Sequence, residues 1–129
     1  MIKINSIVLD GKVYSLGYKV VTKDLKSLGM HKNPNIVQYS INKWYSEPNQ
    51  IEYDEKGRGG IWVARTLSSA KTIQKNYPKE TRIFRTALDK ILYFNGNSLK
   101  TDRINMFEEV SDIEDYSSDF FCYTKTRLN

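Results

Sequence analysis

Short runs of apolar residues, separated by turn signals and interrupted by one helical segment, constrain the fold of this chain most. The dipeptide Asp10-Gly11 separates two such runs. It favours a tight hairpin, because both central positions of a type I′ turn need a positive φ. Further strand-like runs lie at 17–21, 36–41, 61–64, 81–88, 90–94 and 103–110. The clearest helical pattern spans about 68–77 and is ended by Pro78. The sequence therefore predicts an α+β fold that is mostly antiparallel twisted sheet, with this main helix and one or two short helices.

The length of 129 residues suits a single domain whose core needs no metal or disulfide. We expect the domain to span 1–110, with a long loop at 46–60 that contains proline and glycine. Residues 111–129 are expected to form an acidic tail or a helix. The single cysteine, Cys122, cannot form an internal disulfide, and no apolar run resembles a signal peptide or a membrane span. These features predict a cytoplasmic protein with no membrane partner.

The charge of the chain is unevenly distributed. The net charge is +5, yet residues 108–119 contain six acidic residues and no basic one. Residues 1–107 carry nine more basic than acidic residues. A surplus of this size favours phosphate-bearing partners, although a solubilising surface would show it too. The acidic segment offers a different interpretation, in which it imitates a nucleic-acid backbone or caps a basic protein.

The most informative segment runs from the glycine-rich stretch 57–60 through a predicted strand into the predicted helix. Glycines let backbone amides approach an anion, and a helix start presents free N–H groups. We predict that Arg58, Arg65, Ser68 and Ser69 bind a phosphate group, because guanidinium and hydroxyl donors suit its oxygens. A strand follows the glycines, so the segment is not a standard phosphate loop. A surface loop with an ordinary serine N-cap is the alternative.

Aromatic residues interleaved with basic ones give a second indication. Trp62, Phe84 and Tyr93 are the predicted stacking residues, since bases stack on aromatic faces near cations. Most rings in a domain of this size are nevertheless needed for the core. His31 is the only histidine and has no cysteine partner nearby, so we predict no metal site and no cofactor.

The carboxylate pair Glu108 and Glu109 ends the last predicted strand. Alternation along this strand places Ile104, Met106 and Glu108 on one face and Glu109 on the other. Either carboxylate could orient a hydroxyl group or act as a base. An exposed strand end that runs into the acidic segment is the simpler interpretation.

Three segments, taken in order, resemble the skeleton of the ADP-ribosyltransferase-like fold. They are the strand with Lys19, the strand-then-helix unit with Ser68, and the strand that ends in Glu109. In that family the first strand supplies an Arg or His that grips NAD, the second a Ser or Tyr, and the third a Glu that holds the ribose. The resemblance implies Lys19, Ser68 and Glu109 as catalytic residues. The chain has lysine where that family has Arg or His, and Phe107-Glu108-Glu109 in place of a Gln/Glu-x-Glu signature.

The size, basic body and composition also resemble small phage anti-defence proteins. Among these are the Thoeris anti-defence sponges, which sequester cyclic ADP-ribose-type signals without cleaving them. We therefore rank first a binder of a phosphate-bearing nucleotide of ADP-ribose or NAD type, with a homo-oligomer left open. The alternatives are an ADP-ribosyltransferase-like enzyme and an inhibitor that binds a host protein through the acidic segment.

Overall fold

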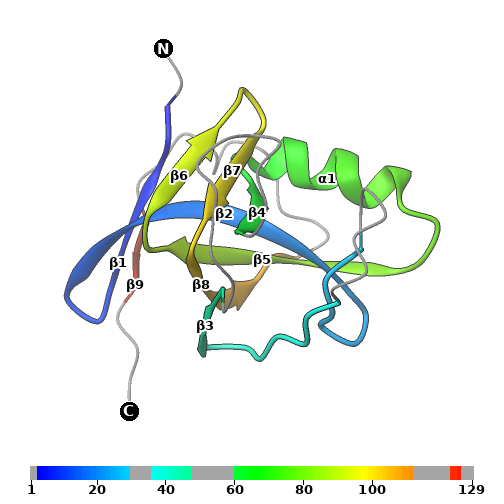
Figure 1. Ribbon diagram of the computed structural model, residues 1–129, viewed down its shortest axis with the longest axis horizontal. Helices are drawn as coiled ribbons and strands as arrows, with labels where there is room; N and C mark the ends of the chain where they lie inside the picture. Colours follow the sequence, from blue (N-terminus) through cyan, green and yellow to red (C-terminus); the bar gives the residue numbers. More distant parts are fainter. Residues whose placement is uncertain (1–2, 30–35, 48–59, 112–122, 126–129) are drawn as a thin grey trace.

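In the part of the chain that the structure describes, one twisted sheet is the main element and a single α-helix lies against it (Figure 1). The computed structural model describes residues 3–29, 36–47, 60–111 and 123–125. The elements are β1 (Ser6–Leu9), β2 (Lys12–Thr22), β3 (Trp44–Ser46), β4 (Ile61–Ala64), α1 (Leu67–Asn76), β5 (Thr81–Leu88), β6 (Ile91–Phe94), β7 (Ser98–Thr101), β8 (Arg103–Glu109) and β9 (Tyr123–Lys125). The sheet follows the order β3-β8-β5-β2-β4-β7-β6, while β1 pairs with β2 and with β9 off this path.

The predicted fold class, mainly antiparallel sheet with a helix, is confirmed. Helix α1 lies within one residue of the predicted 68–77 at each end. It begins at the N-cap Thr66 and ends at Tyr77, which is extended because Pro78 follows it. In the described part of the chain α1 is the only α-helix. The predicted strand at 36–41 is reduced to one bridge between Lys26 and Gln38, and β7 was not predicted.

The hairpin at Asp10-Gly11 forms as the sequence predicts, with φ of 53° at Asp10 and 83° at Gly11. It joins β1 to β2, which continues without a break for 11 residues. This long strand is the centre of the sheet: β5 pairs along one side of it from Ser15 to Thr22. On its other side β1 pairs with the first half, and β4 meets it at Tyr18 and Ala64.

Gly17 marks the place where β4 crosses close to β2. A Cβ atom at this position would lie 2.6 Å from Cγ1 of Val63 and 3.1 Å from the carbonyl oxygen of Ala64. Only glycine allows this approach without moving β4. The glycine therefore fixes how near the β4-β7-β6 wing of the sheet lies to the central strand.

Both faces of the sheet are packed. On one face Tyr18, Val20 and Ile83 contact Leu67 and Ala70 of α1. On the opposite face a larger cluster is built from β2, β4, β5, β7 and β8 together with Tyr39. Its buried members are Val21, Tyr39, Ile61, Val63, Phe84, Leu88, Leu99, Ile104 and Met106. Helix α1 covers only the first face. The twisted sheet itself encloses the second cluster.

A β-bulge interrupts the pairing of β5 with β8 between Arg85 and Thr86. The extra residue shifts the alternation of side chains along the rest of β8. Glu108 therefore lies opposite Arg85, with 3.0 Å between Oε1 of Glu108 and Nη1 of Arg85. It does not share a face with Met106, so the predicted alternation is wrong at Glu108. Arg85 is 3% exposed, and the bulge supplies the carboxylate that its charge requires.

The C-terminal segment contributes a strand. Residues 123–125 form β9, which lies parallel to β1 (Figure 1). The prediction of a tail or helix for 111–129 falls largely on residues 112–122 and 126–129, which lie outside the described residues. In the part of the chain that the structure describes, no helix has the length and apolar character needed to span a membrane.

Candidate functional site

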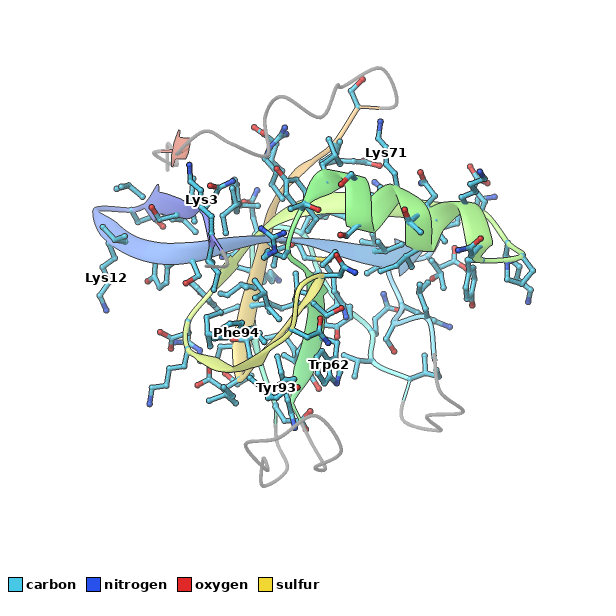
Figure 2. All side chains as sticks on the ribbon, turned by 90° about the horizontal axis from the view of Figure 1, so that it is seen from above. Lys3, Lys12, Trp62, Lys71, Tyr93 and Phe94 are labelled. Atoms are coloured by element: carbon cyan, nitrogen blue, oxygen red, sulfur yellow. The ribbon has the colours of Figure 1, made fainter. Side chains whose placement is uncertain are left out.

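Trp62 and Tyr93 come together on one face of the β4-β7-β6 wing. Both pair in register with Lys100 of the strand between them, so all three side chains lie on the same face. The rings of Trp62 and Tyr93 meet edge to face, with 6.1 Å between centroids and 74° between planes. Both residues are half-buried, and Figure 2 shows them side by side below the start of the helix. Two of the three predicted stacking residues thus form one aromatic pair.

Lys100 and Gly60 support this pair from within. Lys100 is fully buried. Gly60 has φ of +84°, and a Cβ atom there would lie 2.6 Å from Cε of Lys100. The residue just before the strand that carries Trp62 therefore favours glycine for two reasons, its positive φ and its close approach to Lys100.

The start of α1 lies over the same face as the aromatic pair. Ala64, two residues after Trp62, packs against Leu67 and Ala70 and pairs in register with Ser98. Two residues of strand separate Trp62 from Ala64, which is about 7 Å. The aromatic pair and the helix start are thus neighbours on one surface.

The first turn of α1 carries the two predicted serines. Thr66 is the N-cap, and its hydroxyl accepts a hydrogen bond from the Ser69 amide at 3.2 Å. The Ser69 hydroxyl lies 3.5 Å from the side-chain oxygen of Asn97, which belongs to the β6–β7 turn. Ser68 is exposed. Sequence reasoning missed Asn97, although the turn signal Asn95-Gly96 preceded it.

Arg65 holds together three segments of backbone. Its Nε donates to the carbonyl of Gly96 at 2.8 Å, and its Nη1 donates to the carbonyl of Lys3 at 2.8 Å. Its own amide donates to the carbonyl of Asn97 at 2.9 Å. The guanidinium is therefore committed mainly to the protein itself, in contrast to the predicted phosphate fork. The second predicted arginine, Arg58, lies outside the described residues.

Phe84 does not join the aromatic pair. Its side chain is fully buried in the cluster on the face opposite α1. The Arg82 guanidinium lies 5.2 Å from its ring centroid and covers it from outside. Alternation along β5 directs Phe84 away from the helix, so its ring offers no surface for a base.

Lys19, Ser68 and Glu109 are not assembled into one site. Lys19 and Glu109 both pair in register with Phe84, which places them on the same face but two strands apart. Ser68 belongs to the helix on the opposite face. The geometry of the described residues therefore does not reproduce the catalytic set that the family resemblance implied.

Lys19 is a buried cation. Its Nζ donates to the carbonyl of Trp62 at 2.8 Å and lies 5.5 Å from the ring centroid of Tyr39. Burial lowers the pKa of Lys19 from 10.5 to about 8. β2 and β4 pair only at Tyr18 and Ala64, and the Lys19 side chain bridges the two strands next to that pair. Lys19 therefore holds the backbone of Trp62 in place.

Glu109 is engaged by Arg82. The guanidinium donates from Nε and Nη2 to the two carboxylate oxygens at 2.9 and 2.7 Å. These hydrogen bonds lower the pKa of the Glu109 carboxyl group and raise that of Arg82. Among the described residues, no group of three or more His, Cys, Asp or Glu side chains is placed to hold a metal ion.

Comparison of the chain with protein-family models, with curated proteins and with solved structures finds no significant match. The functional argument therefore rests on the geometry of these residues.

Proposed function

We propose that this protein binds a nucleotide of ADP-ribose or NAD type, with a base against the Trp62–Tyr93 pair. The observation that carries the proposal is that two partly exposed rings from β4 and β6 lie 6.1 Å apart. Such a pair offers a sequence-tolerant stacking surface, on which each base contributes about 1–3 kcal/mol. Support from Lys100 and Lys19 beneath the strand keeps the rings in place before a ligand arrives.

The phosphates of the ligand would lie toward the start of α1. The helix has 10 residues, and its N-terminus presents the positive end of the helix dipole together with the hydroxyls of Ser68 and Ser69. The step of about 7 Å along β4 leaves room for a ribose between base and phosphate. In this arrangement Arg65 is a positioning residue, because it ties the β6–β7 turn to the helix start.

Binding without chemistry fits the described residues better than transfer of ADP-ribose. Lys19 is buried, and its ammonium group donates a hydrogen bond to the Trp62 carbonyl. The carboxylate of Glu109 accepts hydrogen bonds from Arg82. We therefore propose that the protein sequesters its nucleotide, as a sponge for a nucleotide signal would. Recovery of the unchanged ligand after heat denaturation, measured by mass spectrometry, separates this function from turnover.

Calorimetric titration with ADP-ribose, NAD and cyclic ADP-ribose tests the site. Trp62→Leu and Tyr93→Leu should each weaken binding by about 5- to 100-fold, which corresponds to the loss of one stacking partner. Phe94→Leu is the matched control, since Phe94 is an aromatic residue of the same strand with 48% exposure and is not part of the pair. Absence of binding by the unmodified protein to all three ligands would refute the proposed function. Equal losses in all three variants would place the ligand elsewhere.

A further inference from the structure

The side chain of Lys19 links the central strand of the sheet to the strand that carries Trp62. The ladder between β2 and β4 has one pair, Tyr18 with Ala64. Next to this pair the Lys19 ammonium group donates to the Trp62 carbonyl at 2.8 Å and so adds a second link. The Trp62 ring belongs to the aromatic pair of the proposed nucleotide site. The position of that ring therefore depends, through the backbone, on a bond that Lys19 makes.

The charge of Lys19 lies in the interior without a carboxylate beside it. The residue is 9% exposed, and none of the ion pairs that the described residues form includes it. Its ammonium group instead lies 5.5 Å from the ring centroid of Tyr39, in a cation–π contact. Burial without a counter-ion disfavours the charged form, and it lowers the pKa of Lys19 from 10.5 to about 8. Lys19 therefore changes its charge just above neutral pH.

The neighbours of Lys19 keep their charge over the same range of pH. The ionisable groups that lie around it, in contact or one residue removed, are Tyr39, Tyr45, Glu47, Arg82 and Glu109. Burial and the Glu47 carboxylate raise the pKa of Tyr39 and Tyr45, so both phenols stay neutral. Hydrogen bonds between Arg82 and Glu109 raise the pKa of the first and lower that of the second, so this pair stays charged. Lys19 therefore titrates while these two phenols and this ion pair do not.

Loss of the proton weakens both contacts of the Lys19 side chain. A hydrogen bond from a charged donor is about twice as strong as one from a neutral donor, and the attraction to the Tyr39 ring needs the positive charge. The neutral amine still donates to the Trp62 carbonyl, so the link to β4 loosens but is not broken. A ring that is held less firmly loses more freedom when a base stacks on it, and this cost reduces affinity.

We propose that the Lys19 ammonium group is a pH-dependent switch of the nucleotide site. The inference rests on the proposed function and adds its regulation. With the proton in place, Lys19 holds β4 and Trp62 ready for the base. Without it, the aromatic pair is less ordered and nucleotides bind more weakly. Because linkage is reciprocal, binding of a nucleotide must favour the protonated form of Lys19 by the same factor.

Calorimetric titration with ADP-ribose at several pH values tests the switch, since ADP-ribose itself does not titrate in this range. The affinity should fall about three- to tenfold between about pH 7 and about pH 9.5. At about pH 8.5 the measured heat should also depend on the ionisation heat of the buffer, because binding takes up a fraction of a proton. Equal affinity at the two ends of the range would overturn this inference and leave the proposed function intact. Absence of binding at every pH would refute the proposed function and this regulation with it.

Two variants fix the charge at this position. Lys19→Met removes the charge and should bind ADP-ribose, at every pH, with the weaker affinity that the unmodified protein shows at alkaline pH. Lys19→Arg keeps the charge, because a guanidinium is not deprotonated in proteins, and should retain the neutral-pH affinity throughout. Lys12→Met is the matched control, since Lys12 is an exposed lysine of the same strand and lies far from Trp62 (Figure 2). It should keep the pH dependence of the unmodified protein. A pH dependence that persists in Lys19→Met would overturn the assignment, whether or not the larger guanidinium fits.

Discussion

Replacement of Arg65 by alanine is the most informative single change. The side chain connects the carbonyls of Lys3 and Gly96, so its loss detaches the N-terminal segment and the β6–β7 turn from the start of α1. The sequence alone predicts a solvent-facing arginine that binds phosphate and contributes little to stability. The structure leads to the opposite expectation.

The magnitude follows from the two hydrogen bonds. A bond to a charged group contributes about 1.5–3 kcal/mol when it is buried. Because Arg65 is half-buried, water replaces part of each bond in the variant. We expect Arg65→Ala to lower the free energy of unfolding by about 1–3 kcal/mol in total. For a domain of this size the melting temperature should fall by about 4–12 °C.

Urea unfolding followed by circular dichroism measures this loss. Arg65→Lys should recover less than half of the stability, because an ammonium group cannot reach two carbonyls with the geometry of the guanidinium. Lys71→Ala, on α1 but not part of the connection that Arg65 makes, provides the control. An unfolding free energy within about 0.3 kcal/mol of the unmodified protein, together with tenfold weaker nucleotide binding, would refute this reasoning and restore the phosphate fork.

Two further predictions concern the central strand. Gly17→Ala should destabilise the protein by about 1–3 kcal/mol, since its Cβ would lie 2.6 Å from Val63. Thermal unfolding of both variants measures this, and Gly96→Ala is the control with almost no expected effect, since nothing lies within 4 Å of its Cβ position. Equal losses of stability in the two variants would show that the contact of Gly17 with Val63 does not matter. Lys19→Met should be more stable than the unmodified protein near pH 7. Burial lowers the pKa of Lys19 to about 8, so the folded protein carries a desolvated charge below that pH. Between about pH 8 and 10.5 the unfolded chain keeps a proton that the folded protein has released, so the advantage of the variant should shrink by roughly 3 kcal/mol across this window. A difference in unfolding free energy that is independent of pH would contradict the buried cation.

Local signals made parts of the fold predictable. The turn at Asp10-Gly11 depends only on positive φ, and the limits of α1 depend on Thr66 and Pro78, so neighbouring residues were sufficient. The bulge in β8 depends on the register with β5, and no local pattern marks it. The alternation of side chains was therefore predicted correctly at Met106 and wrongly at Glu108.

The candidate site depends on contacts between distant parts of the chain. Trp62 and Tyr93 become neighbours because β7 lies between their strands, and β7 itself was not predicted. Arg65 finds its partners at Lys3 and Gly96, so its structural role is invisible in the sequence around it. Phe84 looked equivalent to Tyr93 in composition, but strand order placed it at the centre of the sheet and Tyr93 near the edge. Residue types indicated the chemistry, and topology decided which of them meet.

The emission of Trp62 tests the central claim most directly. The chain has two tryptophans, and Trp44 packs against Tyr14 and Arg103, where phenylalanine keeps most of the contact. In a Trp44→Phe variant all tryptophan fluorescence comes from Trp62. Addition of ADP-ribose, NAD or cyclic ADP-ribose should quench this emission to saturation, with the same dissociation constant that calorimetry gives. Calorimetric binding that leaves the Trp62 emission unchanged, or that quenches Trp44 in a Trp62→Phe variant, would contradict it.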